Sequence, residues 1–170
     1  MNKSELKQRF SPILEQQRLT PYVTSIICLS SQLEQIKPVV SGAKQEVLAQ
    51  LKPTIRARET NRRRSNSKLR PGTTITNWEN ICYADEPDQN TAFTMLNQKL
   101  LELYPNDNDV KNGFCPQLVI ASKIAQVKFE LCKIMLAVLD ENPNRILSVE
   151  KRDKLVNIAL GLTLAYNKAK

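Results

Sequence analysis

Apolar residues recur at alternating steps of three and four along most of this 170-residue chain. This spacing places side chains on one face of an α-helix, and it leaves little room for the two-residue alternation of a strand. One short β-prone run, residues 73–76, is too brief to found a sheet. The sequence therefore predicts an all-α fold, a helical bundle of about five to six helices with a basic loop or extension between two halves.

Prolines divide the predicted helices of the first half. A first helix over residues 4–17 should be interrupted near Phe10 or Ser11, because Pro12 costs about 3 kcal/mol inside a helix. Pro21 can begin a second helix, and we expect Pro38 to stop it. A shorter helix over residues 41–52 should follow and end at Pro53, so that these two helices form a hairpin. The apolar stripe of the longer one is Tyr22, Ile26, Leu29, Leu33 and Ile36.

The second half contains three predicted helices. Asn90 or Thr91 can cap the first, which Pro105 closes, and the polar tract 106–109 should be a turn or an exposed loop. A central helix over residues 116–139 has a broad apolar face, which suits burial among several helices. Ser148 can cap the last helix. The apolar stripe of the first of these helices is Phe93, Leu96, Leu100 and Leu103. That of the central helix is Leu118, Ile120, Ile124, Val127, Leu131, Ile134, Met135, Leu136, Val138 and Leu139. That of the last helix is Leu155, Ile158, Leu162 and Ala165.

Length and composition predict a single helical domain over residues 1–170. Apolar residues make up 41% of the chain and charged residues 25%, both near the averages of globular proteins. Within the domain we expect N-terminal helices over residues 4–52, a basic linker over 53–72 and a C-terminal helical core over 90–170. The composition also excludes wholesale disorder.

An arginine-rich segment, residues 52–70, contains six of the ten arginines and carries a net +7 of the chain's +8. Guanidinium groups form paired hydrogen bonds with phosphate oxygens. Ile55 and Leu69 are the only large apolar residues here, so the segment is either a flexible loop or a polar helical extension. The sequence predicts that it binds the phosphate backbone of RNA or DNA through Lys52, Arg56, Arg58, Arg62, Arg63, Arg64, Lys68 and Arg70.

Other interpretations of this segment stay open. It can pair with the chain's own acidic residues just downstream, Glu79, Asp85, Glu86 and Asp88. Residues 62–65 also fit a basophilic kinase site or a nuclear-import signal, although both patterns are short. Stacking of bases on an aromatic side chain is conceivable, but we expect Trp78 to dock on the bundle because aromatics do not interleave with the arginines.

The residue types argue against catalysis. The chain has no histidine, which removes the commonest general base and the commonest metal ligand. Its glycines are isolated and form no phosphate cradle, and the acidic tracts 85–88 and 107–109 resemble ordinary turns rather than an Mg²⁺ site. We predict that the protein is not an enzyme and uses no metal, cofactor or small-molecule substrate.

Cysteine spacing and hydropathy bear on the redox state of the thiols and on the cellular location of the protein. Cys28, Cys82, Cys115 and Cys132 are far apart in sequence, so we expect reduced core thiols rather than a metal site or disulfides. Charges interrupt the longest apolar stretches, and the N-terminus lacks an apolar signal core. We therefore expect a cytoplasmic protein without membrane contact, or a virion component made inside a cell.

Three functional hypotheses follow. The first is a non-catalytic subunit that binds a nucleic-acid backbone within a larger nucleoprotein complex, together with other protein subunits. Small basic all-helical subunits of CRISPR effector complexes have this general character, although no motif in the chain carries a resemblance to them. The second is a phage structural component such as a ring-forming connector. The third is an adaptor that binds an acidic protein surface.

Overall fold

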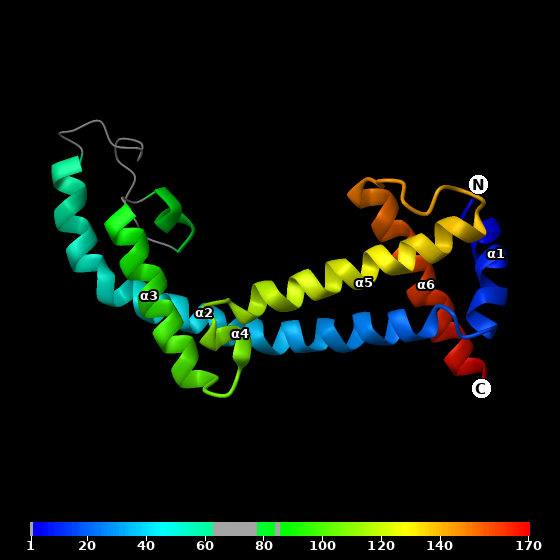
Figure 1. Ribbon diagram of the computed structural model, residues 1–170, viewed down its shortest axis with the longest axis horizontal. Coiled ribbons are helices and arrows are strands. Elements are labelled where there is room, and N and C mark those ends of the chain that lie inside the picture. The colour runs from blue at the N-terminus through cyan, green and yellow to red at the C-terminus, as the bar shows by residue number, and fades with distance from the viewer. Residues whose placement is uncertain (1, 63–77, 84–85) are drawn as a thin grey trace. The chain divides into compact units, whose positions relative to one another are not determined.

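The computed structural model describes residues 2–62, 78–83 and 86–170 (Figure 1). Helices account for every regular element in these ranges, and no strand occurs among them, which confirms the all-α helical bundle. The elements are α1 (Lys3–Glu15), α2 (Thr20–Arg62), the 3₁₀ helix η1 (Trp78–Tyr83), α3 (Glu86–Leu103), α4 (Asn108–Lys111), α5 (Pro116–Val138) and α6 (Val149–Ala169).

The chain forms two compact units. Unit 1 comprises residues 1–33 and 120–170, and unit 2 comprises residues 34–119. Helices α2 and α5 contribute residues to both units. That the two units behave as one domain stays a prediction.

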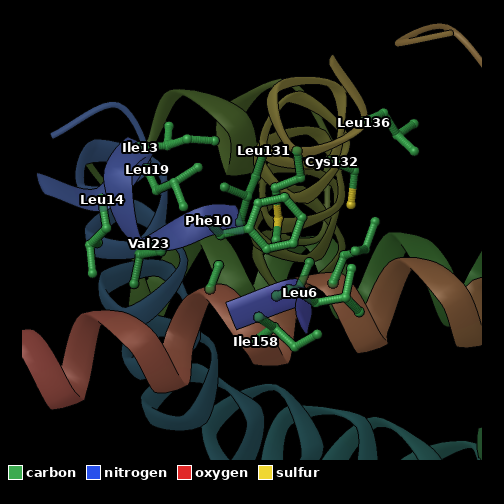
Figure 2. Close-up of a cluster of buried hydrophobic side chains, with 14 of the residues drawn as sticks. Leu6, Phe10, Ile13, Leu14, Leu19, Val23, Leu131, Cys132, Leu136 and Ile158 are labelled. Carbon is green, nitrogen blue, oxygen red and sulfur yellow. The ribbon is translucent and has the colours of Figure 1, made fainter. Parts of the chain in front are cut away.

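Unit 1 is built around a hydrophobic core at the centre of which lies Phe10, whose side chain is fully buried. Figure 2 shows its ring among side chains from the other helices of the unit. Helix α1 packs against α6, and the start of α2 and the second half of α5 complete the core. Burial of each large side chain contributes about 1.5–3 kcal/mol. The main contributors are Leu6, Phe10, Ile13, Leu14, Leu19, Val23, Leu131, Met135, Leu136, Leu155, Val156 and Ile158.

The predicted interruption at Pro12 is wrong, because α1 continues from Lys3 to Glu15 with Pro12 inside it. Buried side chains lie on both sides of the proline, at Phe10 and Ile13, and their burial outweighs the lost hydrogen bond. A capping box secures the first turn: the Glu5 amide donates to Asn2 Oδ1 over 2.9 Å, and Glu5 Oε2 accepts from the Asn2 amide over 2.8 Å.

The predicted hairpin of helices 20–37 and 41–52 is also wrong. One helix, α2, runs from Thr20 to Arg62 through Pro38 and Pro53. Its buried stripe continues in helical register across Pro38, so stopping the helix there would expose apolar side chains that the continuous helix buries. A proline removes one backbone hydrogen bond, which is a smaller loss than this burial. The stripe of α2 on both sides of Pro38 is Ile36, Val40, Ala43 and Val47.

Helices α3 and α4 differ from expectation at their starts. Helix α3 begins at Glu86, before Asn90, and the Thr91 hydroxyl donates to the Pro87 carbonyl over 2.8 Å instead of capping. The tract 106–109, predicted to be a turn or exposed loop, includes the first two residues of α4 and Asp107, whose Oδ1 caps the first turn of that helix. Leu96 and Leu100 are buried as predicted, whereas Phe93 and Leu103 are nearly half exposed.

Helices α5 and α6 agree with the sequence prediction to within a residue or so. Helix α5 covers 116–138, and Ser148 caps α6 by accepting a hydrogen bond from the Lys151 amide over 3.3 Å. Leu131, Met135 and Leu136 are buried, but Leu118 is 68% exposed and does not extend the buried face.

Among the described residues, three helices end in a left-handed turn. Gln17 follows α1 with φ 58°, Asp140 follows α5 with φ 57°, and Gly113 follows α4 with φ 85°. The hydrogen bonds are those of a Schellman motif: after α1, the Arg18 amide donates to Ile13 O over 3.0 Å and the Gln17 amide to Leu14 O over 2.8 Å. Gln17 and Asp140 adopt this conformation although they carry a β-carbon, which costs about 1–2 kcal/mol.

Candidate nucleic-acid interface

The structure places half of the predicted phosphate-binding residues on one helix. Lys52, Arg56, Arg58 and Arg62 lie on the last turns of α2. Arg63, Arg64, Lys68 and Arg70 lie outside the described residues. Up to Arg62, therefore, the arginine-rich segment is the helical extension and not the flexible loop, and the predicted end of the helix over residues 41–52 at Pro53 is wrong.

The local sequence explains why the helix continues past Pro53. Arg56, Ala57, Arg58 and Glu59 are among the residue types with the highest helix propensity. Cations near the C-terminal end of a helix also interact favourably with its dipole. Both effects favour the helical conformation after Pro53 and act against the cost of the hydrogen bond lost there.

The spacing of the cations along this helical extension produces electrostatic repulsion between like charges. Lys52 and Arg56 are four residues apart, as are Arg58 and Arg62, so each pair occupies successive turns of one helix face. Like charges at this spacing destabilise a helix by about 0.2–0.5 kcal/mol per pair, and Glu59, three residues from both Arg56 and Arg62, offsets part of this repulsion. An anion with regularly spaced charges relieves this repulsion, and a nucleic-acid backbone is such an anion.

An aromatic pair in unit 2 is the second feature of interest. The rings of Trp78 and Phe93 meet edge to face with centroids 5.9 Å apart, and Lys44 Nζ lies 5.8 Å from the centre of the Trp78 ring. Trp78 is half-buried, in agreement with the prediction that it docks on the helices, while Phe93 is 47% exposed. An exposed aromatic beside a cation can stack on a nucleobase.

Sequence reasoning missed Phe93 and Lys44 as candidates. Phe93 falls in the apolar stripe of α3 and reads as a core residue, and Lys44 has no unusual neighbour in sequence. The contact of Lys44 with Trp78 joins α2 to η1, so only the fold brings the three residues together.

Elsewhere on unit 2, Lys99 is paired with an acid. Lys99 Nζ lies 2.7 Å from Glu46 Oε2, and this hydrogen-bonded carboxylate, followed by the nearby Glu102, raises the pKa of Lys99. The same residues line a polar cavity of about 160 Å³ between α2 and α3. Of the acids considered as internal partners of the arginines, Asp88 is buried and Glu79 is exposed; Asp85 and the side chain of Glu86 lie outside the description.

Metal-binding groups and free thiols bear on whether the described part of the chain can carry out chemistry. Within it, no group of three or more Cys, Asp or Glu side chains is placed to hold a metal ion. Cys132 is buried, Cys115 half-buried and Cys28 exposed, all with free thiols, so the prediction of core thiols is wrong for Cys28; the side chain of Cys82 is not described. Burial raises the pKa of the Cys132 thiol to about 11, against the opposing effect of Arg152, and keeps it from acting as a thiolate nucleophile at neutral pH.

None of the helices in the described ranges has the length and apolar character that crossing a membrane requires. A scan against protein-family models finds no match to the chain, and searches of curated proteins and of solved structures find none either.

Proposed function

We propose that this protein is a non-catalytic subunit that binds the phosphate backbone of RNA or DNA within a larger nucleoprotein complex. The observation that carries the proposal is the concentration of charge: residues 52–70 hold a net +7 of a total +8. Binding rests on Lys52, Arg56, Arg58, Arg62, Arg63, Arg64, Lys68 and Arg70. Contacts of this kind read charge and shape rather than base sequence.

Two structural observations support this function. Helix α2 continues to Arg62, so the backbone of this part of the segment is already ordered, which lowers the ordering cost on binding. The exposed ring of Phe93 offers a place for an unpaired base in the same unit, next to Trp78, over whose ring the Lys44 amine lies. A cytoplasmic location fits the proposal, because the thiols of Cys28, Cys115 and Cys132 are unpaired and disulfides are rare there.

The salt dependence of binding tests the proposal. Fluorescence anisotropy with labelled random-sequence nucleic acids should show affinity falling steeply between 50 and 200 mM KCl, as expected for six or more phosphate contacts. The fall should be on the order of 10³-fold or more for duplex DNA and roughly 300-fold or more for single-stranded RNA and single-stranded DNA. Replacing Arg62, Arg63 and Arg64 by alanine should reduce the slope of log K against log salt by about 2–3.

A matched control removes three exposed cations from unit 1, Lys3, Lys7 and Arg9, and should leave the slope almost unchanged. If both triple variants lose affinity equally, binding is a general effect of net charge and the assigned interface is wrong. If the Arg62, Arg63 and Arg64 variant binds as the wild type does across the titration, the proposal of backbone contact fails.

A further inference from the structure

A small pocket in unit 1 combines cations with apolar walls. It lies between the second half of α5, the loop that follows it and the first turn of α6, and its volume is about 160 Å³. Pockets for drug-sized ligands usually measure about 300–1,000 Å³, so this one has room for a single side chain. We call it the Arg152 pocket; it is lined by Phe129, Cys132, Lys133, Leu136, Pro143, Arg145, Ile146, Leu147 and Arg152.

Exposed apolar side chains stand at this pocket. Ile146 is 94% exposed and Phe129 is 45% exposed. Ile146 sits on the loop between α5 and α6, where a polar residue would satisfy the local backbone equally well. The Cys132 thiol also lines the pocket and is uncharged there, since burial keeps it protonated. Clustered exposed apolar groups of this kind mark surfaces that bind other molecules.

The charged residues of the lining are all cationic: Lys133, Arg145 and Arg152. Each has an acid nearby outside the pocket. Arg145 Nη1 lies 3.0 Å from Glu141 Oε2. Lys133 Nζ lies 3.9 Å from Glu130 Oε1, and Arg152 Nε lies 3.9 Å from Asp153 Oδ1. These pairs are partly exposed, and the two longer distances exceed a hydrogen bond, so they contribute little and exchange readily for an incoming carboxylate.

Arg152 has unused hydrogen-bonding capacity. Its Nε is buried without a hydrogen-bond partner, and such a donor is costly to leave unpaired. A carboxylate that draws the guanidinium toward the pocket would give it an acceptor with the two-pronged geometry that arginine favours.

We infer that the Arg152 pocket binds an acidic protein segment that inserts one apolar side chain. The walls and Ile146 receive the apolar side chain, and the three cations receive flanking carboxylates. A nucleic-acid backbone would satisfy the cations but leave Ile146 and Phe129 exposed, so the mixed lining favours a peptide. The inference is independent of the proposed nucleic-acid binding, because it uses other residues in the other unit.

The test uses the full-length, ¹⁵N-labelled protein and three capped pentapeptides, each with Leu, Ile or Phe at the centre of four Asp or Glu residues. At least one peptide should shift amide resonances of residues that line the pocket. Peptides with a central Ser, or with Asn and Gln in place of the acids, should bind at least about tenfold more weakly. If none of the three peptides binds, or if the shifts lie elsewhere, the inference is wrong.

Two variants and their matched controls assign the binding. Ile146→Ser and Arg152→Gln should each weaken the best peptide about tenfold or more, while Leu164→Ser and Lys151→Gln should change its affinity less than twofold. Leu164 is 55% exposed and Lys151 is the exposed neighbour of Arg152, and neither lines the pocket. Equal losses in the variants and the controls would overturn the assignment. The assignment would also be overturned if an oligonucleotide bound at this pocket while the peptides did not. That result would not affect the anisotropy test of binding by the arginine-rich segment.

Discussion

The arginine-rich segment and the Arg152 pocket are both cationic, but their surroundings differ. The segment has only Ile55 and Leu69 as large apolar residues among its cations. The pocket places its cations beside Phe129 and Ile146, which are exposed. Charge without apolar surface suits a phosphate backbone, whereas charge with an apolar wall suits an acidic segment that carries an apolar side chain. The neighbours of a cation thus indicate its partner better than the charge itself does.

The two regions also differ in what supports them. Cys132 and Leu136 belong both to the core of unit 1 and to the lining of the pocket (Figure 2). The arginine-rich segment lacks the apolar residues to form such a core of its own. We therefore expect core substitutions to affect the pocket strongly and charge removal in the segment to leave stability intact.

The largest expected effect is that of Leu131→Ala. Leu131 is fully buried in the core of unit 1, so its truncation should lower the free energy of unfolding by about 2–5 kcal/mol. The Arg62, Arg63 and Arg64 to alanine variant should change it by less than about 0.5 kcal/mol. Urea denaturation of both variants measures the difference. Similar losses in the two would remove the contrast between a core-supported pocket and an unsupported segment.

A smaller effect concerns pH and Cys132. Because burial raises the pKa of this thiol to about 11, the folded state holds the proton more tightly than the unfolded state does. The resulting stability is fully present below about pH 9 and is lost as pH rises toward 11, by up to about 2 kcal/mol. Urea denaturation at pH 8 and pH 10.5 should show this loss in the wild type and in Cys28→Ala, and a shallower loss in Cys132→Ala. Parallel curves for all three would mean that the Cys132 thiol is hydrated.

The smallest expected change in the free energy of unfolding tests whether the Ser148 cap holds the loop between α5 and α6. Ser148 ends this loop and caps α6, so Ser148→Ala should lower the free energy of unfolding by about 1 kcal/mol. Ser31→Ala, at an exposed position within α2, should be neutral or slightly stabilising because alanine favours a helix. Thermal denaturation of the two variants compares them. A neutral Ser148→Ala would show that the loop is held by its packing alone.

Much of the fold could be predicted because a helix is marked by sequence signals within or next to its own residues. The apolar period and the Ser148 cap located α5 and α6, since both signals lie within a few residues of the elements they define. Proline misled the prediction at Pro12, Pro38 and Pro53. Its local cost is known from the sequence, but the burial that outweighs it depends on partners distant in the chain.

The candidate sites divide in the same way. The arginine-rich segment is visible as a run of charge, and its helical form to Arg62 was one of two predicted alternatives. The Arg152 pocket left no such trace, because Ile146 and Phe129 are 17 positions apart in sequence and line one pocket only in the folded chain. Phe93 was assigned to the core because periodicity shows which residues share a helix face and not whether that face is covered.

The left-handed turns at Gln17 and Asp140 have a consequence for mutational tolerance. Both side chains are exposed, and exposed positions usually accept most substitutions. At these two, a β-branched residue would clash with its own backbone, while glycine, asparagine or aspartate would fit. In a saturation scan, two surface sites of unit 1 should therefore discriminate among amino acids by backbone preference, independently of charge and hydropathy.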